Sequence, residues 1–490
     1  MQLPRLPADF RPTDLRGQRV LVLGLGTFGG GLGAARHLAR EGAKVVVSDL
    51  RGPDALAEPL RALEGVPVEL ALGREATDEV SKADWIVASP AVKWSSPPLQ
   101  EAARRGVPVE SEITLLVRLL PCPWLGITGT NGKSTTTMLS SRTLAAAGRR
   151  VFSGGNLGGS LLEVWREIEA GDATVLELSS FQLEHLGETG LGPTVALVTN
   201  VTPDHLDRHG TFEEYATAKR AILSRASVAL LQRADPVCRS FAEEFAGRVV
   251  WYGEAKAFER DEPGARLDDR RFAVLRDAQG REERVDLETM VLRGTHNRVN
   301  LLAAAAAATE FGVAFGAAAR AGLDARPLER RLNEVARVDG VLYVDDSVCT
   351  SPPAVAAALA AFPGPTRLLV GGYDKGIDPT PLIAALFSRS GKSYLYGAVA
   401  TALAARLEVA FAARVAGARE STSKSASESA KWPSWEVFAD LSAAFAAAAR
   451  EAAPGDTVLL SPGYASYDQF RNFTERGDLF RALVARLSTS

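Results

Sequence analysis

Short apolar runs alternate with longer stretches of helical character along almost the whole chain. The strand-like runs include "RVLVLGLG", "KVVVSD", "WLGIT", "VALVTN" and "TVLLSPG". This alternation is typical of parallel β-sheets whose strands are joined by helices. Polar residues cluster at or just after the ends of these runs, and ligands bind open α/β sheets outside the carboxyl ends of the strands. The pattern therefore predicts an α/β fold with functional residues along those edges.

The length of the chain indicates more than one such sheet. Its 490 residues correspond to roughly three domains of ordinary size. We place the domain ends near Glu112, ahead of the strand that leads into a glycine-rich loop, and near Pro327, after a long alanine-rich stretch. A segment rich in Ser, Lys and Glu, residues 416–434, is expected to be a mobile surface insertion. The predicted domains are 1–112, 113–327 and 328–490.

Charge and hydropathy exclude several classes of protein. The net charge is -3 and no block of Lys or Arg stands out, which argues against a nucleic-acid platform. The first residues lack the apolar core of a signal peptide, and we find no uncharged apolar stretch of about 18 residues. The alanine-rich run from Leu301 to Ala319 carries Glu310 and predicts a buried helix. We expect small-molecule partners, with no nucleic acid and no membrane.

The cysteines give no sign of a metal site or a redox pair. Cys122, Cys238 and Cys349 are widely spaced, and none belongs to a CxxC motif. Free thiols at such spacing fit a reducing compartment. We therefore predict a cytoplasmic location.

The stretch "ITGTNGKSTTT", residues 127–137, predicts a phosphate-binding loop between a strand and a helix. The full Walker pattern places a glycine five residues before its Gly-Lys-Ser/Thr end. This chain has Ile127 there, but Gly129, Gly132, Lys133 and Ser134 remain. Successive backbone N–H groups at a helix start, with a lysine beside them, hold an anion. The alternative is a glycine turn with an exposed lysine.

A second glycine motif lies near the start of the chain. The run "VLGLGTFGG" contains Gly24, Gly26 and Gly29 in dinucleotide-fingerprint spacing, and Asp49 ends the next strand. Such an acid is placed to accept from a ribose hydroxyl. A nicotinamide-dependent dehydrogenase is therefore one interpretation. The same geometry suits any nucleotide diphosphate, and a purely structural turn is a third reading.

Acidic residues and a histidine follow two other predicted strands. Glu177 ends "TVLELS", while "VALVTNVTPDHLDRHG" places Asp204 and His205 after a strand that ends at Asn200. With the hydroxyl of Ser134, these groups could hold Mg²⁺ against triphosphate oxygens. His205 is unusual in such a set because Mg²⁺ prefers oxygen ligands. A hydrogen-bonded loop histidine is the alternative.

The chain resembles the Mur ligases of peptidoglycan synthesis, and particularly their glutamate-adding branch. The resemblance covers nearly the whole chain and rests on the order and approximate spacing of several motifs. These are "GTNGKSTTT", "ELSSFQLE", "NVTPDHLDRHG", "AKRAI", "GTHNRVN", "VDDSVCTSP", "GGYDKG" and "SPGYASYDQFRNFTERG". The combination is far more specific than any one motif.

The resemblance implies a fold and a reaction. The fold has a Rossmann-like N-terminal domain for UDP, a central P-loop ATPase domain with a mostly parallel sheet, and a Rossmann-like C-terminal domain for the amino acid. The reaction uses ATP and Mg²⁺ to join D-glutamate to UDP-N-acetylmuramoyl-L-alanine through an acyl phosphate. The Gly24 fingerprint would then bind UDP rather than NAD. A ligase adding L-glutamate or another amino acid, and a protein that only binds these ligands, remain alternatives. We expect a monomer.

The resemblance also implies roles for single residues. Lys133 would contact the β- and γ-phosphates, while Ser134, Glu177 and His205 match magnesium positions. The implied nucleotide-binding residues are Gly129, Thr130, Asn131, Gly132, Lys133, Ser134, Thr135, Asn297, Asn300, Arg331 and Asp346. The implied substrate-binding residues are Gly26, Thr27, Asp49, Asn156, Thr350, Lys375, Ser466 and Phe473. Asparagine capping of a helix is the alternative reading of Asn297 and Asn300.

Three departures from the family pattern bear on these assignments. Val348 stands where relatives usually have a lysine, so one cation expected near the glutamate is missing. Arg330 and Asn333 replace the ends of a common His-Arg-x-Glu motif. Ala91, in "SPAVKW", replaces a glycine. None of these changes touches the predicted ATP loop.

Lys219, in "EEYATAKRAI", matches the family lysine that reacts with CO₂ to form a carbamate. A carbamate is an anion and can be a ligand of magnesium, whereas an ammonium group repels the metal. The resemblance therefore adds Lys219 to the catalytic and metal-binding residues. The alternative is an ordinary solvated lysine on a polar helix.

Overall fold

The computed structural model of the chain describes residues 3–26, 29–388, 391–420 and 433–487. The chain divides into two compact units, Met1–Thr289 with Val299–Leu323, and Met290–Arg298 with Asp324–Ser490. Two parts of the sequence-based predictions lie outside the described residues: Thr27 and residues 421–432 of the predicted insertion.

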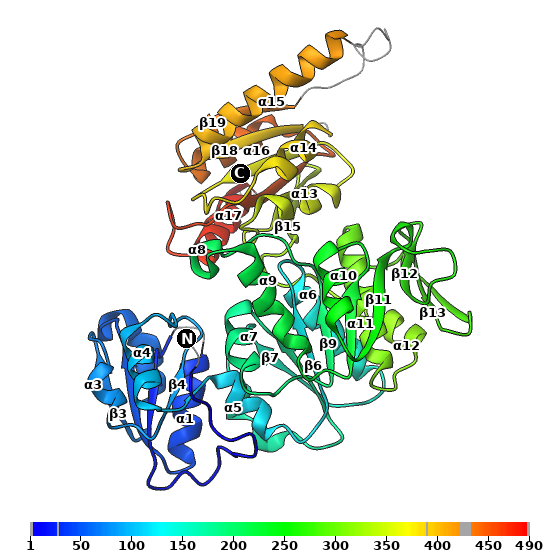
Figure 1. Cartoon of the computed structure of the whole chain (residues 1–490). Helices are drawn as coiled ribbons and strands as arrows, with labels where there is room; N and C mark the ends of the chain where they lie inside the picture. Colours follow the sequence, from blue (N-terminus) through cyan, green and yellow to red (C-terminus); the bar gives the residue numbers. More distant parts are fainter. Residues whose placement is uncertain (1–2, 27–28, 389–390, 421–432, 488–490) are drawn as a thin grey trace. The chain divides into compact units, whose positions relative to one another are not determined.

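The first unit begins with a five-stranded parallel sheet in the order β3-β2-β1-β4-β5 (Figure 1). Its strands are β1 (Arg19–Leu23), β2 (Lys44–Asp49), β3 (Val68–Leu72), β4 (Trp85–Ala88) and β5 (Val109–Glu110). Its helices are α1 (Gly30–Arg40), α2 (Ala57–Ala62), α3 (Thr77–Val80) and α4 (Pro97–Arg105). The connections reverse direction between β1 and β4, so the carboxyl ends of these two strands flank the crevice where such sheets bind ligands.

The same unit contains a nine-stranded sheet in the order β14-β13-β12-β11-β10-β9-β6-β8-β7. Its strands are β6 (Trp124–Thr128), β7 (Val151–Gly155), β8 (Ala173–Glu177), β9 (Val195–Val198), β10 (Val228–Gln232), β11 (Arg248–Glu254), β12 (Gly264–Asp268), β13 (Phe272–Arg276) and β14 (Glu282–Asp286). Its helices are α5 (Glu112–Leu119), α6 (Lys133–Ala145), α7 (Ser180–Gly187), α8 (Leu206–His209), α9 (Phe212–Arg220), α10 (Pro236–Glu244), α11 (Thr295–Thr309) and α12 (Phe315–Ala321). The first four residues of α11 belong to the second unit. In the order of the sheet, the neighbouring strands from β7 through β6 to β12 pair parallel. The pairs β12–β13 and β13–β14 are antiparallel.

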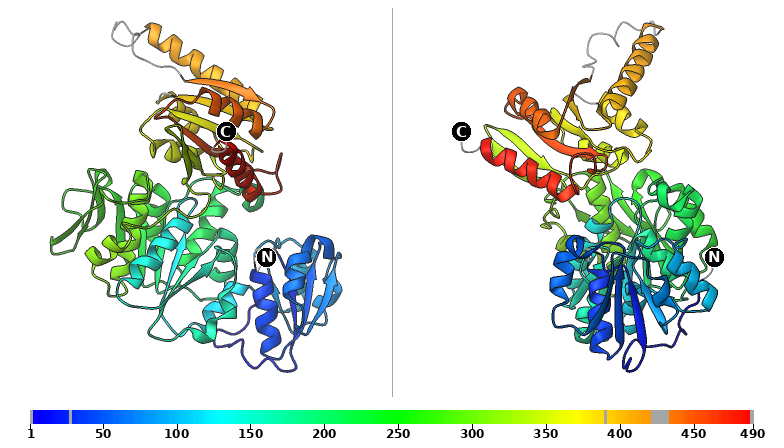
Figure 2. Two further views of the ribbon diagram at one scale, coloured as in Figure 1. Left: turned by 180° about the vertical axis from the view of Figure 1, so that it is seen from behind. Right: turned by 90° about the vertical axis from the view of Figure 1, so that its left-hand side faces the viewer.

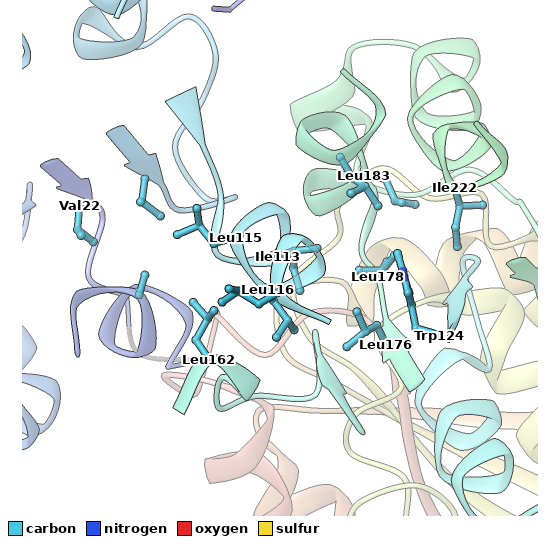
Figure 3. Close-up of a cluster of buried hydrophobic side chains, with 14 of the residues drawn as sticks. Val22, Ile113, Leu115, Leu116, Trp124, Leu162, Leu176, Leu178, Leu183 and Ile222 are labelled. Carbon is cyan, nitrogen blue, oxygen red and sulfur yellow. The ribbon is translucent and has the colours of Figure 1, made fainter. Parts of the chain in front are cut away.

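One apolar cluster joins the two sheets of the first unit. Figure 3 shows α5 contributing Ile113, Leu115 and Leu116 between Val22 of the first sheet and Leu176 of the second. Because these side chains are almost fully buried, their removal from water stabilises the packing of both sheets on α5.

The second unit has a six-stranded sheet in the order β15-β16-β20-β17-β18-β19. Its strands are β15 (Asn333–Val338), β16 (Val341–Asp345), β17 (Thr366–Gly371), β18 (Gly391–Tyr396), β19 (Ser434–Phe438) and β20 (Thr457–Gly463). Its helices are α13 (Pro352–Ala360), α14 (Thr380–Phe387), α15 (Ala400–Glu420), α16 (Leu441–Glu451) and α17 (Phe473–Leu487). Only the β15–β16 pair is antiparallel among these strands. Residues 416–420, predicted as insertion, instead extend α15.

Helices cover both faces of this sheet (Figures 1 and 2). Leu368 and Val370 of β17 belong to the apolar cluster with α13, α14 and α15. Leu369, between them, belongs to the cluster with α16 and α17. Successive side chains of a strand point to opposite faces, so a continuous apolar strand is explained by burial on both sides. The three sheets together confirm the predicted three-domain α/β fold, while the domain ends near Glu112 and Pro327 stay predictions.

The alanine-rich run forms two helices rather than one. Ala303–Ala308 are buried in α11 as predicted, but the helix ends at Thr309 and α12 starts at Phe315. Gly312, with φ of 81°, takes the left-handed conformation in the turn between them. Among the described helices, none combines the length and apolar character needed to cross a membrane.

Candidate active site

The glycine-rich loop after β6 has the shape of an anion cradle. Gly129 and Gly132 adopt φ of 142° and 86°, conformations that L residues rarely take. Gly132 immediately precedes α6, which starts with Lys133. The first N–H groups of a helix have no partner within it and carry the positive end of its dipole. The loop therefore presents backbone donors to an anion, as the sequence predicts.

Residues after β9 hold this loop from one side. Asn200 O accepts from Thr130 N at 2.7 Å. The side-chain amide of Asn200 pairs with the backbone of Asn131, because Oδ1 accepts from Asn131 N and Nδ2 donates to Asn131 O, both at 3.0 Å. Thr199 Oγ1 also donates to Asn131 O, at 2.7 Å. These bonds fix the loop before any ligand arrives.

Lys133 lies against the loop that precedes it. Its Nζ donates to Gly129 O at 3.0 Å and to Thr130 O at 2.9 Å. Ser134, the next residue, is buried in the first turn of α6. The ammonium group is thus already at the mouth of the cradle, where it can reach phosphate oxygens by a change of rotamer.

Lys219 is buried, so the alternative reading of a solvated helical lysine is wrong. Only 2% of the residue is exposed, and its Nζ donates to Gly129 O at 2.7 Å. Burial and the neighbouring Lys133 lower the pKa of Lys219 well below its usual value, while Asp204 and Glu177 oppose that shift. Two acids, one at the end of β8 and one after β9, and two lysines of α6 and α9 therefore act on one another around the loop.

Glu177, the last residue of β8, has one carboxylate oxygen paired and one unpaired. Oε1 accepts from Asn156 Nδ2 at 2.8 Å, and Asn156 N also donates to Glu177 O at 2.8 Å. Oε2 is buried and has no hydrogen-bond partner among the residues that the structure describes. A buried carboxylate oxygen without a partner is costly unless a cation or donor completes it. Glu177 and Asn156 are thus brought together as a pair, with one carboxylate oxygen left for a cation or a donor.

The donor set fits a magnesium ion shared with a nucleotide. Within the described ranges, no three His, Cys, Asp or Glu side chains are grouped to hold a metal by themselves. Mg²⁺ is commonly held by one or two carboxylates together with substrate phosphates and water. The oxygen Glu177 Oε2 and the Ser134 hydroxyl are oxygen ligands of the kind that such a site needs.

His205, just before α8, has a strained backbone. Its φ is 54°, and its side chain is 41% exposed. Asp204 Oδ1 accepts from the backbone N–H of His205 at 2.9 Å, and the ring of Phe181 meets the imidazole edge-on at 5.2 Å. A non-glycine residue held in the left-handed region costs about 1–3 kcal/mol and is typical of functional sites. The predicted metal role of His205 stays a prediction.

The two predicted asparagines of α11 behave differently. Gly132 leaves space for Asn300, because a Cβ on that glycine would lie 3.0 Å from Asn300 Oδ1. Asn300 therefore packs directly against the phosphate loop. Asn297 is buried, and its Nδ2 donates to Arg293 O at 2.7 Å. In this bond the amide donates to a carbonyl from within α11, whereas a capping side chain accepts from a helix N–H, so this bond is not the cap of the alternative reading.

The first glycine motif forms a tight turn after β1. Gly24 and Gly26 have φ of 89° and 68°, and Gly26 N donates to Asp49 Oδ2 at 3.3 Å. Arg51 pairs with the same carboxylate at 2.9 Å. Burial raises the pKa of Asp49, but its bonds to Arg51 and Gly26 outweigh burial and lower that pKa overall. The acid predicted to meet a ribose is thus ionised and held at the turn.

In the second unit, the predicted glutamate-side residues gather at one sheet edge. Thr350, Lys375 and Ser466 follow the carboxyl ends of β16, β17 and β20, which are adjacent and parallel. A bridge between Tyr373 and Ala465 joins the loops that carry Lys375 and Ser466. Phe473 starts α17.

Asp346 directly follows β16 at the same edge. Burial raises its pKa to about 7, while Ser461 Oγ donates to its Oδ2 at 2.7 Å and Leu332 N to its Oδ1 at 3.2 Å. Arg331, the predicted phosphate contact, is the residue before Leu332. The structure therefore places Asp346 and the Arg331 loop side by side.

The departures from the family pattern have local partners. Arg330, with φ of 59°, pairs with Asp478 at 2.5 Å, and Asn333 Oδ1 accepts from Arg481 at 3.1 Å. Arg476 is fully buried beside Val348, with Nη2 donating to Ser347 O at 2.9 Å. Sequence reasoning missed this buried cation, although it stands in the quoted motif "NFTERG".

Sequence reasoning also missed Tyr215. Its hydroxyl lies 3.0 Å from Thr130 Oγ1, and Lys219 Nζ lies 4.6 Å from the centre of its ring. Tyr215 and Lys219 are four residues apart on α9, so they share one helix face. That spacing in "EEYATAKRAI" was the available signal.

Three family models match the chain. The "Mur ligase MurD-like, N-terminal domain" matches residues 18–111, the "Mur ligase middle domain" matches 127–308, and the "Mur ligase, glutamate ligase domain" matches 330–463. Together they span all three sheets.

Similar proteins include three named UDP-N-acetylmuramoylalanine--D-glutamate ligase. The one from Roseiflexus sp. (strain RS-1) is 42% identical and covers 96% of this chain and 99% of its own. Those from Anaeromyxobacter dehalogenans and Symbiobacterium thermophilum are 42% and 36% identical, and each match covers 96% of this chain and 98% of the relative.

Solved structures with the same fold are more distant in sequence. A pseudomurein peptide ligase type C from Methanothermus fervidus is 19% identical with a TM-score of 0.58, and the match covers 96% of this chain and 100% of that one. The UDP-N-acetylmuramate-alanine ligase from Thermotoga maritima is 17% identical with a TM-score of 0.58, covering 96% and 99%.

Proposed function

This chain belongs to the Mur ligase family, and we propose on that premise that it is the ATP-dependent ligase that joins D-glutamate to UDP-N-acetylmuramoyl-L-alanine. The reaction belongs to peptidoglycan precursor synthesis. Full-length likeness to ligases of that name supports the amino acid. The oxidoreductase reading of the Gly24 motif finds no support in these relatives.

The observation that carries the proposal is the grouping around Gly129. Gly129 O accepts from both Lys133 and Lys219, at 3.0 and 2.7 Å, and Glu177 contributes to the field at Lys219. A carboxylate does not acylate an amine until its oxygen becomes a better leaving group, and ATP supplies the phosphoryl group that does this. Lys133 and the loop N–H groups would hold the negative charge that develops during that transfer.

Mg²⁺ would be held by Glu177 and Ser134, with His205 near a second ion as the resemblance implies. When bound, it neutralises phosphate charge and orients the reacting oxygens. Asn156 keeps Glu177 Oε1 occupied, so Oε2 is the oxygen left to face the metal. Asn300, packed against Gly132, would keep the nucleotide side of the loop in place.

The carbamate on Lys219 is part of this proposal. CO₂ reacts with a neutral amine, and burial beside Lys133 favours the neutral form of Lys219. Losing the positive charge removes its repulsion from Lys133, and the resulting anion would offer oxygens to a metal. Tyr215, with its ring 4.6 Å from Nζ, closes the site on the helix side.

For the amino acid, the carboxyl edge of the third sheet supplies the groups. Lys375 would meet a glutamate carboxylate, with Thr350 and Ser466 as hydroxyl partners and Phe473 as the apolar wall. Asp346 and Arg331 would meet the ribose and phosphate of the nucleotide. The predicted monomer and cytoplasmic location stay predictions.

The test measures phosphate release with purified protein. Wild type is given ATP, Mg²⁺ and UDP-N-acetylmuramoyl-L-alanine with either D- or L-glutamate, and Lys133→Ala serves as the inactive control. We expect release only with D-glutamate, and a loss of about 10³-fold in the variant because it lacks the cation at the transferred phosphoryl group. Release with L-glutamate alone would contradict the assigned amino acid, and equal release by Lys133→Ala would remove the loop from the reaction.

A further inference from the structure

The loop Ser89–Trp94, which follows β4, forms one wall of the crevice beside the first glycine motif. β1 and β4 are the strands between which the connections reverse, and open α/β sheets bind ligands at that point. Gly24 presses on the loop, because a Cβ there would lie 2.8 Å from Ser89 Cβ and 3.4 Å from Val92 Cγ2. A ligand held at the glycine turn therefore meets this loop.

Arg208, in α8, holds the same loop by its backbone. Its guanidinium donates to Pro90 O at 2.6 Å, Ala91 O at 2.9 Å and Val92 O at 3.2 Å. Because one side chain binds three successive backbone carbonyls, it fixes the path of the loop. The planar fork of arginine can do this, whereas the single ammonium of lysine cannot reach all three. The segment includes Ala91, one of the departures from the family pattern.

The other side of Arg208 faces the segment that carries His205. Its guanidinium lies 4.4 Å from the centre of the Phe181 ring. That ring meets His205 edge-on at 5.2 Å and stacks on His209 at 5.1 Å. Burial lowers the pKa of Arg208, although Glu184 and Asp207 oppose that shift. The cation is therefore desolvated between the loop carbonyls and an aromatic face, an arrangement that fixes its position.

A second connection runs parallel to the first. Trp94, at the end of the loop, donates from Nε1 to Glu184 Oε2 at 3.1 Å. Glu184 Oε1 lies 3.1 Å from His209 Nδ1, and His209 Nε2 lies 2.9 Å from Ser180 Oγ. Both routes start in the crevice loop and end in α7 and α8.

We propose that Arg208 is a positioning residue that transmits occupation of the crevice by the UDP-sugar substrate to His205, which lies three residues before Arg208 in the same segment. Through the backbone of Ser89–Trp94, substrate binding fixes Arg208, and Arg208 with Phe181 fixes the imidazole near the phosphate loop. Binding at one end of the substrate thereby orders a group at the reacting end. The inference rests on the proposed function, because it needs that substrate in the Gly24 crevice.

The experiment follows hydrogen–deuterium exchange of full-length protein with and without UDP-N-acetylmuramoyl-L-alanine, in the absence of ATP. In wild type, we expect slower exchange in both Ser89–Trp94 and Asp204–His209. In Arg208→Ala, the first segment should still be protected and the second should not. Persistent protection of Asp204–His209 in this variant would overturn the inference. Arg220→Ala, which removes a half-buried arginine paired with Glu244 on the neighbouring helix, is the matched control and should behave as wild type.

Steady-state kinetics of Arg208 variants are a second test. They distinguish a positioning role of Arg208 from a role only in stabilising the fold. We expect Arg208→Ala and Arg208→Lys each to lower kcat by about tenfold, with KM for the UDP-sugar substrate and KM for ATP both unchanged within about twofold. A rise in KM for the UDP-sugar substrate with kcat unchanged would overturn the inference. A second variant, Trp94→Phe, serves if Arg208→Ala folds poorly. It keeps Arg208 and removes only the hydrogen bond to Glu184, so substrate should protect Asp204–His209 from exchange less than in wild type. Phosphate release by the wild-type protein tests the ligase function separately from the role of Arg208. If the wild type releases no phosphate, the proposed function is contradicted and not the role of Arg208.

Discussion

At the scale of single residues, sequence patterns predicted which residues form a phosphate loop better than they predicted which side chains are buried. The spacing around Gly129 predicts a phosphate loop, and the structure has one. The burial of Lys219 could not be predicted from the sequence alone, because it depends on Gly129, which is 90 residues away along the chain. The orphaned Oε2 of Glu177 is likewise a product of packing, since Asn156 takes only one of its oxygens.

Lys219→Ala should lose activity by about 10²-fold or more, because the variant removes an anion that would face the metal. Acetate or formate in the assay should restore part of the rate by filling the vacated site. Lys219→Arg should not respond, since the guanidinium fills the space with permanent positive charge. Phosphate release at increasing acid concentration measures this.

Lys256→Ala is the control, because Lys256 is exposed and pairs only with Glu254 among the described contacts. It should be fully active and insensitive to the acids. Full activity of Lys219→Ala would refute the role of this lysine, and inactivity without rescue would contradict the carbamate.

Lys375→Ala should raise KM for D-glutamate by about tenfold and leave KM for ATP nearly unchanged, because Val348 leaves Lys375 as the cation predicted to meet the amino acid. Initial rates at varied glutamate and varied ATP measure both constants. Lys392→Ala is the matched control in the same unit, since Lys392 lies at the start of β18 and pairs with Glu436 and Glu451. A similar rise in both constants for Lys375→Ala would contradict the assignment.

At the scale of helices and strands, the alternating pattern predicted the parallel core of all three sheets. It missed β3, β5, β7, β11, β15, β16 and β19, as well as β12, β13 and β14. The apolar residues of the last three are interrupted by charged ones. Arg266, Arg276 and Glu282 meet across these strands as exposed or half-buried ion pairs. An edge hairpin needs little apolar surface on its outer face, so its sequence resembles a loop.

Gly129→Ala should destabilise the first unit by about 3 kcal/mol and abolish nucleotide binding. The φ of Gly129 is 142°, and a Cβ there would lie 1.9 Å from Thr199 Oγ1. Strain and overlap together force the loop away from the end of β9. Urea unfolding and binding of a fluorescent ATP analogue measure the two effects.

Gly171→Ala is the control, because Gly171 has nothing within 4 Å of an added Cβ. Its stability should match wild type within about 0.5 kcal/mol. Wild-type binding by Gly129→Ala would mean that the loop tolerates the side chain and is not held as described.

At the scale of the whole molecule, the sequence predicted three α/β domains but not their grouping into two compact units. The grouping depends on apolar contacts such as those of Ile113 and Leu116 with residues of two different sheets. The sequence alone does not distinguish an apolar side chain that packs within one domain from one that packs between two domains.

His185→Phe should make the first unit less sensitive to acid. Burial lowers the pKa of His185 to about 3, with smaller contributions from Arg5 and Arg208. The unfolded chain, with an ordinary histidine pKa near 6.5, takes up this proton as pH falls and the folded chain does not. From pH 7 to pH 5, the wild-type fold therefore loses about 2 kcal/mol through this group.

The measurement is the urea midpoint of variant and wild type at both pH values. The comparison with wild type matters because burial raises the pKa of Glu112 to about 7, and that group stabilises the fold as pH falls over the same range. Glu112 is present in both proteins, so its contribution cancels. The same pH dependence in both would mean that His185 already carries a proton in the folded protein.

The boundary between the two units within α11 limits how the protein can be divided into fragments. Met290–Arg298 belongs with the second unit, although the residues on both sides of it belong to the first. Arg293 ties this segment to the second unit through an ion pair of 2.6 Å with Glu334, and its guanidinium lies 5.7 Å from the centre of the Phe362 ring. No single cut can therefore release two complete halves. A fragment that starts at Asp324 lacks part of its own packing, so it depends on a second fragment that supplies residues 290–298.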